Sequence, residues 1–361
     1  EGRSFRIVTS SGLLRHDMLC QSISMPFHTG KIGSDVLRSS VLRYRGRHDP
    51  SVILGSSIGE DAALVSLRGK VLVLKTDPIT GTTSDIGFLS VHINANDIAC
   101  RGGRPRWFLC DLLLPKRSNA RLIETIMRQV DKAARALGMA VVGGHTEVTP
   151  GLKKPIFVGC MVGIVDKGKY VTSHGARPNH DIIMTKSAGI EGTAVLAMDF
   201  SHKLRLDSKL MARARAMRRS ISIVPEAMIA VKTGGVSALH DPTEGGLLQG
   251  VWEIAEASKV GFIVNESRIR IRNETIRICN SFHVNPLRLM SSGCLLIAAN
   301  KRKSRMIVRQ LRQHGIQAEI IGTFVDRKKG RKLIRPNGSR LDVRANERDE
   351  LYRVIEAYEK H

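Results

Sequence analysis

The chain is 361 residues long, 42% of its residues are apolar, and 57 Lys and Arg outnumber 33 Asp and Glu, which gives a formal net charge of +24. This length and apolar content suit two domains with a core each, and they exclude a disordered or fibrous chain. The sequence contains no apolar run of about eighteen residues or more, so we expect no membrane-spanning helix.

Positive charge is densest in the second half, around residues 203–219, 301–312 and 327–329. Solvated basic helix faces are the first interpretation, and salt-sensitive attraction of nucleotides or nucleic acid is the second. Aromatic residues make up only 4% of the chain, which leaves few side chains for stacking on bases. The charge therefore predicts nonspecific polyanion binding, with a nucleic-acid-binding protein as the weakest functional hypothesis.

The start of the chain lacks the continuous apolar segment of a secretory signal. Met25-Pro26-Phe27 resembles a natural start, so residues 1–28, and 1–24 in particular, are expected to be an extension outside the fold. The six cysteines form no C-x-x-C pair or zinc spacing. They are interpreted as buried thiols in a reducing cytoplasm.

Apolar spacing predicts alternating helices and strands in the first half. The helix expected at residues 87–101 has an apolar face and a second face with Ser90, Asn94, Asp97 and Arg101, spaced four, three and four residues apart. That second face is either an ordinary solvated face or one that addresses an ion or a phosphate, and the order of the motifs described below favours the second interpretation. The expected elements are a helix at 31–45, strands at 51–54, 62–66 and 70–75, helices at 87–101 and 121–137, and strands at 139–142 and 156–165.

The second half shows the same alternation after a linker at residues 171–179, and it includes a glycine-rich turn at 189–193. The expected elements are a strand at 181–185, basic helical residues at 194–232, a strand at 236–239, a helix ending near 258, strands at 261–264, 294–298 and 318–324, and helices at 304–314 and 349–359. We therefore predict an α/β or α+β protein with domains at 29–172 and 173–330 and a C-terminal tail with a helix at 331–361.

Three short segments each place a carboxylate beside glycine, small residues or the end of an apolar run. They contain Asp61, Asp77 and Asp97. A lone aspartate of this kind is usually a turn residue, but three of them within about forty residues can supply hard oxygen ligands for Mg²⁺. Three carboxylates close together repel one another unless a cation lies among them, which favours a metal site.

The segment Ile58-Gly59-Glu60-Asp61-Ala62-Ala63 resembles the G-x-D-D-A-A motif of the superfamily that includes aminoimidazole ribonucleotide (AIR) synthetase, thiamine-monophosphate kinase, selenophosphate synthetase and HypE. Later motifs follow in the same order, and the overall pattern is most similar to HypE and HypE-like proteins. These motifs are Thr76-Asp77, Asn94-x-x-Asp97, Gly143-Gly144-His145-Thr146-Glu147 and Asp241-Pro242-Thr243-Glu244-Gly245-Gly246.

The resemblance implies two-domain chains whose N-terminal domains pair in a homodimer through a shared β-barrel, with ATP and Mg²⁺ held in a cleft between the domains. It also implies a small-molecule substrate of unknown identity and a possible maturation-protein partner. By motif position, the catalytic and metal-binding carboxylates would be Asp61, Asp77 and Asp97. The nucleotide cleft would be completed by Glu60, Asn94, Gly143, Gly144, His145, Thr146, Asp241 and Glu244.

Four departures from the family pattern bear on the reaction. Glu60 replaces an aspartate, His145 replaces the aspartate of G-G-D-T, and Glu244 stands where HypE usually has arginine. The sequence also has no cysteine after Cys294, so HypE chemistry on a C-terminal cysteine is not expected. The resemblance thus implies an enzyme that transfers the ATP γ-phosphoryl group to an oxygen of a carbonyl, carbamoyl or phosphate substrate. The alternative is an inactive nucleotide-binding regulatory or maturation partner.

Overall fold

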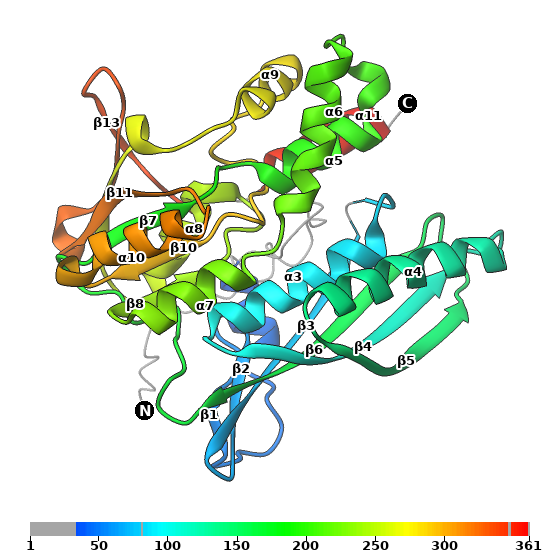
Figure 1. Cartoon of the computed structure of the whole chain (residues 1–361), viewed down its shortest axis with the longest axis horizontal. Coiled ribbons are helices and arrows are strands. Elements are labelled where there is room, and N and C mark those ends of the chain that lie inside the picture. The colour runs from blue at the N-terminus through cyan, green and yellow to red at the C-terminus, as the bar shows by residue number, and fades with distance from the viewer. Residues whose placement is uncertain (1–33, 81, 346–347, 360–361) are drawn as a thin grey trace, which may run out of the picture.

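The computed structural model describes residues 34–80, 82–345 and 348–359, which form two β-sheets with helices packed against them (Figure 1). The predicted extension at residues 1–28 lies outside these ranges. No helix in them is both long and apolar enough to cross a bilayer. The two sheets and the surrounding helices confirm the predicted mixed α/β class.

The first sheet has the strand order β1-β2-β3-β6-β4-β5, and every neighbouring pair is antiparallel except β4 and β5. Helices α3 and α4 lie on one face of it (Figure 1). The strands are β1 (Val52–Leu54), β2 (Ala63–Leu67), β3 (Lys70–Ile79), β4 (Arg104–Leu114), β5 (Ala140–Val148) and β6 (Ile156–Asp166), and the helices are α2 (Ser34–Val36), a single π turn (Leu37–Val41), α3 (Ile86–Cys100) and α4 (Ala120–Ala136).

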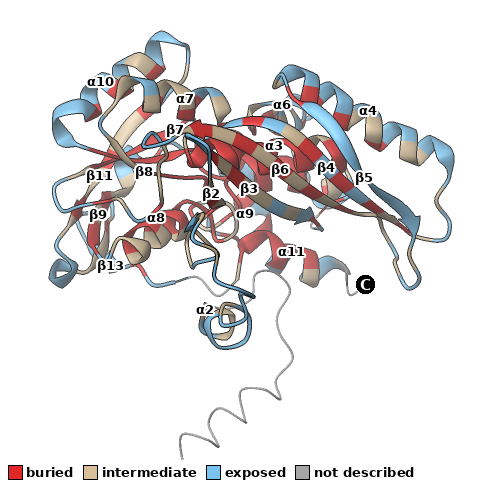
Figure 2. Cartoon of the chain, turned by 90° about the horizontal axis from the view of Figure 1, so that it is seen from below, coloured by how far each residue is buried: buried red, intermediate tan, exposed pale blue. Residues whose placement is uncertain are grey.

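Helix α3 is buried on nearly every side, and Figure 2 shows it almost wholly in the buried colour. One face packs on β3 and β6, and the other contacts α7 (Val224–Thr233) and β8 (Val236–His240) of the second half. Its polar residues Ser90, Asn94 and Asp97 are buried against β3 and β6 of the first sheet rather than solvated. Asn96 instead contacts Ile221 and Asp241 of the second half. The helix thus carries polar groups into the domain interface.

The second sheet has the order β13-β12-β9-β11-β7-β10-β8. Alternate residues of β7 point to opposite faces, so Ile182 and Met184 pack with α8, while Ile183 packs with α7 and α10. The strands not yet bounded are β7 (Asp181–Thr185), β9 (Gly261–Asn265), β10 (Leu296–Ala299), β11 (Ala318–Val325), β12 (Arg331–Ile334) and β13 (Arg340–Asp342), and the two helices are α8 (Gly246–Ala257) and α10 (Lys301–Gln313).

Helices α5 (Ile190–Asp199), α6 (Ser208–Ala216), α9 (Asn273–Phe282) and α11 (Glu350–Glu359) form a separate apolar cluster beside this sheet. The basic helical stretch predicted at 194–232 is divided among α5, α6 and α7, with short 3-10 turns at Ser201–Lys203 and Met217–Ser220. Further 3-10 turns lie at Glu266–Arg268 and Arg327–Lys329. Because β12 pairs with β9 and β13 with β12, the second sheet continues past residue 330.

Glycines of β6 allow α3 to approach the sheet. A Cβ at Gly163 would lie 2.1 Å from the Ile98 side chain and 2.9 Å from the Arg104 carbonyl oxygen. We expect Gly163→Ala to lower the free energy of unfolding by about 1–3 kcal/mol, because the added carbon forces the helix away from the sheet. Urea denaturation measures the change. Gly55→Ala is the control, since its Cβ would meet only Val52 at 3.7 Å; an equal loss in both variants contradicts this account of the packing.

Candidate active site

The C-terminal end of α3 carries a fully buried cation. The Arg101 side chain is 0% exposed and donates to Glu60 at 2.8 Å, Asp61 at 2.5 Å and the Ser173 hydroxyl at 2.6 Å. Burial opposes its charge, but Asp61 and Glu60 hold the pKa of Arg101 above its usual value. Both acids of the Glu60-Asp61 pair are thus neutralised within the protein.

A buried histidine completes this network from the second half of the chain. His240, at the end of β8, lies 2.6 Å from the second oxygen of Asp61 and 2.7 Å from Glu253. Burial lowers the pKa of His240, but the two carboxylates outweigh it and raise the pKa to about 10. Burial raises the pKa of Asp61, yet His240 and Arg101 bring it below the usual range. Asp61 is therefore paired with two cations, and its contact with His240 joins the two halves.

The other two predicted carboxylates share a lysine. Lys75 and Asp77 lie two residues apart, on one face of β3, and the Lys75 ammonium lies 2.9 Å from Asp97 and 3.5 Å from Asp77. Burial raises the pKa of Asp97 to about 6 although Lys75 opposes the rise. The structure thus brings Asp77, near the end of β3, and Asp97, in the last turn of α3, to one positive charge.

Three more polar side chains lie beside this pair. Asn94 donates to the carbonyl oxygens of Ser90 at 2.9 Å and Asp77 at 3.4 Å, while Asn96 donates to Asp241 at 2.9 Å. One buried oxygen of Asn94 and one of Asp241 accept no hydrogen bond within the described ranges. Burial, then the charge of Asp97, raises the pKa of Asp241 well above its usual value. Asp241 therefore reaches the first domain through Asn96, which the motif comparison did not select.

The donor set suits a hard cation in part. Asp77 and Asp97 converge on the Lys75 charge, and unpaired oxygens of Asn94 and Asp241 lie nearby, which is the oxygen chemistry that Mg²⁺ prefers. Asp61 has both oxygens committed to Arg101 and His240. In the part of the chain that the structure describes, no three His, Cys, Asp or Glu side chains are grouped to hold an ion. The assignment of Asp61, Asp77 and Asp97 as metal ligands stays a prediction.

The Gly143-Gly144-His145-Thr146 motif lies on β5, at the exposed edge of the first sheet (Figure 2). Asp77 stands opposite Gly159, Gly159 opposite Cys110, and Cys110 opposite Gly144. Three strand spacings, or roughly 14 Å, thus separate Gly144 from Asp77. A Cβ at Gly144 would lie 1.9 Å from the Cys110 carbonyl oxygen, so this glycine permits strand pairing. Within one chain the motif does not adjoin the carboxylates.

A pocket of about 300 Å³ opens where β3 ends, between the two halves; we refer to it as the cleft pocket. Glu191 of α5 and Tyr352 of α11 line it, and sequence reasoning identified neither as a site residue. Glu244, which it did identify, accepts a hydrogen bond from Tyr352 at 3.4 Å. The full lining comprises Asp77, Pro78, Ile79, Thr80, Thr82, Ile93, Glu191, Val195, Thr243, Glu244, Met290, Ser292, Leu351 and Tyr352.

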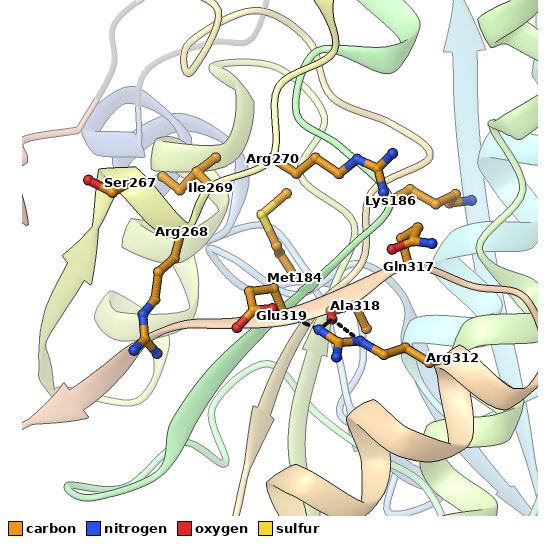
Figure 3. Close-up of a pocket in the computed structure, with 10 residues that line it drawn as sticks. All are labelled: Met184, Lys186, Ser267, Arg268, Ile269, Arg270, Arg312, Gln317, Ala318 and Glu319. Atoms are coloured by element: carbon orange, nitrogen blue, oxygen red, sulfur yellow. Dashed lines mark hydrogen bonds and ion pairs between the residues drawn. The ribbon is translucent and has the colours of Figure 1, made fainter. Parts of the chain in front are cut away.

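A second hollow of about 240 Å³ lies where β7 ends and β11 begins, and its lining includes several basic side chains (Figure 3). Its cations are largely engaged: Lys186 contacts Glu226 at 2.6 Å and two carbonyl oxygens, and Arg312 binds Glu319 at 2.7 Å. None of the predicted catalytic residues lies there. The cleft pocket, which includes Asp77 and Glu244, is therefore the better candidate for chemistry.

The buried Arg101 network predicts a large effect on stability. We expect Arg101→Met to lower the free energy of unfolding by about 3–5 kcal/mol, because Glu60 and Asp61 would each lose a buried partner. Arg128→Met is the matched control: its pair with Glu124 is exposed on α4 and is worth less than about 1 kcal/mol. Urea denaturation compares the variants. Similar losses in both would show that the buried pairing is not what stabilises this interface.

Comparison with known proteins assigns the chain to a family. Residues 59–165 match the N-terminal domain of AIR synthase related proteins, and residues 177–334 match the C-terminal domain. A putative hydrogenase expression/formation protein of Methanocaldococcus jannaschii is 27% identical over 83% of this chain and 90% of its own. The carbamoyl dehydratase HypE of Cupriavidus necator is 28% identical over 74% of this chain and 77% of its own.

Solved structures agree on the fold. HypE in complex with ATP superposes with a TM-score of 0.69 at 23% identity, covering 90% of this chain and 98% of its own. HypE in the HypE–HypF complex gives a TM-score of 0.68 at 21% identity, covering 79% of this chain and 93% of its own. Since the two domain matches together span well over half of the sequence, the chain belongs to the family of AIR synthase related proteins.

Proposed function

We propose that this protein is an ATP- and Mg²⁺-dependent enzyme that uses the γ-phosphoryl group to activate an oxygen of a small carbonyl, carbamoyl or phosphate substrate. One observation carries the proposal: Asp77 and Asp97 converge on a single positive charge, and Asp77 also lines the cleft pocket. The relatives named carbamoyl dehydratase and the HypE structure solved with ATP support the use of ATP.

The reaction would break the bond between the γ-phosphorus and the bridging oxygen of ADP and form one to the acceptor oxygen, with ADP leaving. Asp77 and Asp97 would hold Mg²⁺, which would neutralise the phosphate charge. Asp61 could join them only by giving up its pairing with Arg101 or His240. The protein's part is mainly positioning. Arg101 holds the Glu60-Asp61 turn within the first domain, and His240 joins Asp61 to the second. Asn96 fixes Asp241. These buried contacts hold the two walls of the cleft at a set distance.

We also propose that two chains pair through β5. This edge strand is exposed along its whole length and carries apolar side chains, Val141, Val142 and Val148, with exposures of 40%, 53% and 56%. An uncovered apolar edge strand is a surface suited to another chain. Pairing would cover the Gly143–Thr146 motif and place it at an interface, and this would explain its distance from the carboxylates of its own chain. By analogy with the HypE–HypF complex, a maturation protein is a further candidate partner.

The carboxylate site is tested by Asp77→Asn. We expect Mg²⁺-dependent ATP binding to weaken at least tenfold, because Asp77, one of the two carboxylates proposed to hold Mg²⁺, loses its charge. Calorimetric titration with a non-hydrolysable ATP analogue, with and without Mg²⁺, measures the change. Asp166→Asn, in β6 of the same sheet and paired with Lys70, is the control. Unchanged binding in Asp77→Asn rejects the site, whereas binding without turnover for any acceptor favours the inactive regulatory alternative.

Dimerisation is tested by the double substitution Val142→Lys and Val148→Lys. Charges on the exposed edge should turn a dimer into a monomer in sedimentation velocity and weaken ATP binding, because the Gly143–Thr146 motif would lose its interface. Met306→Lys on α10, at a side chain 39% exposed, is the control and should leave the dimer intact. A parent protein that sediments as a monomer at micromolar concentration contradicts the proposal.

A further inference from the structure

The cleft pocket has the opposite charge to the protein that contains it. The chain carries a net charge of +24, yet the pocket is lined by three carboxylates, from Asp77, Glu191 and Glu244, and by no Lys, Arg or His. Asp349 lies just behind, where its carboxylate accepts from the Gly245 amide at 2.6 Å. A negative pocket in a basic protein requires the charges to be placed individually, since the overall composition opposes it.

Glu191 is the member of this set that points to a ligand. It lies in the first turn of α5, is only 5% exposed, and has one oxygen that accepts no hydrogen bond in the described part of the chain. A buried carboxylate oxygen without a donor is costly, so such an oxygen indicates a partner absent from the protein itself. Burial raises the pKa of Glu191 to about 7, with neighbouring Ser292 opposing the rise and Asp349 adding to it.

We propose that the cleft pocket is the acceptor-substrate site and that it takes a substrate with a cationic nitrogen group, an ammonium, guanidinium or amidinium, whose N–H donors bind Glu191 and Glu244. This inference rests on the proposed function, since it names the substrate class of the same site. It differs from the ATP site because Glu191 and Glu244, which are not among the proposed Mg²⁺ ligands, would repel a triphosphate.

The shape and composition of the lining favour an organic cation over a metal ion. The carboxylates come from β3, α5 and the turn before α8, and no three of them gather at one point among the residues described. Apolar side chains complete the wall, namely Ile93, Val195, Met290 and Leu351. A volume of about 300 Å³ with a few polar groups on an apolar lining suits a small molecule.

Helix α11 contributes to specificity in this arrangement. Tyr352 is 7% exposed, lines the pocket and donates to Glu244 at 3.4 Å. Helix α11, which follows the residues that match the family's C-terminal domain, therefore closes one side of the site. The Asp349 carboxylate also accepts from the Leu351 amide at 2.7 Å and thereby holds the start of the helix beside the Gly245 turn. Tyr352 thus acts as a positioning residue that orients Glu244.

The test is calorimetric binding of four probes that share a five-carbon chain: pentylammonium, pentylguanidinium, pentanol and pentanoate. The salt concentration is about 0.15 M, so that long-range attraction is screened. We expect the two cations to bind at least tenfold more tightly than pentanol, and pentanoate to show no heat. Glu191→Gln should reduce cation binding at least tenfold, and the exposed control Glu124→Gln should not. Glu244→Gln is the second variant should Glu191→Gln fail to fold.

Retained Mg²⁺-dependent ATP binding in Glu191→Gln separates this inference from the proposed function. If ATP binds but pentanol binds as tightly as pentylammonium, the substrate class is wrong and the proposed function stands. The inference is overturned if pentylammonium does not bind, Mg²⁺ alone binds to the parent protein, and Glu191→Gln abolishes that Mg²⁺ binding. The pocket would then be a metal site. Cation binding that survives both glutamine substitutions also overturns it.

Discussion

The structure depends on charges that are buried and paired across the domain interface. Arg101 is fully buried, and the free energy needed to remove its guanidinium from water must be offset by the carboxylates of Glu60 and Asp61. His240 closes the network from the second half of the chain. The first half pairs Arg101 with two carboxylates of its own, and the second oxygen of Asp61 is paired by His240 of the second half. This cross-domain contact favours one relative placement of the domains, and the cleft pocket lies between them.

Much of the fold follows from local signals in the sequence. The helix expected at 87–101 agrees with α3 within a residue, and the two sheets arise from strands that alternate or are wholly apolar. What periodicity could not show is that the polar face of α3 is buried. A stripe with Asn94 and Asp97 has the same spacing whether it faces water or the strands of its own sheet, so the choice depends on tertiary contacts with β3 and β6 that the spacing does not reveal.

The site was only partly predictable for a similar reason. Asp61, Asp77 and Asp97 could be selected because their motifs are short and contiguous, but their partners come from elsewhere in the chain. Lys75 had a usable signal, since it lies two residues before Asp77 and side chains in a strand point the same way at that spacing. Tyr352 had none, because nothing in a terminal amphipathic helix indicates that its tyrosine reaches Glu244.

The basic composition and the acidic cleft are compatible because they act over different distances. A net charge of +24 raises the local concentration of anionic nucleotides around the molecule, and this long-range effect does not require any particular binding site. Inside the cleft, Glu191 and Glu244 act over a few ångströms and disfavour phosphate. The surface therefore favours encounter with ATP, while the pocket reserves the space beside Asp77 for a different and positively charged molecule. Such a separation would prevent a second nucleotide from occupying the acceptor position.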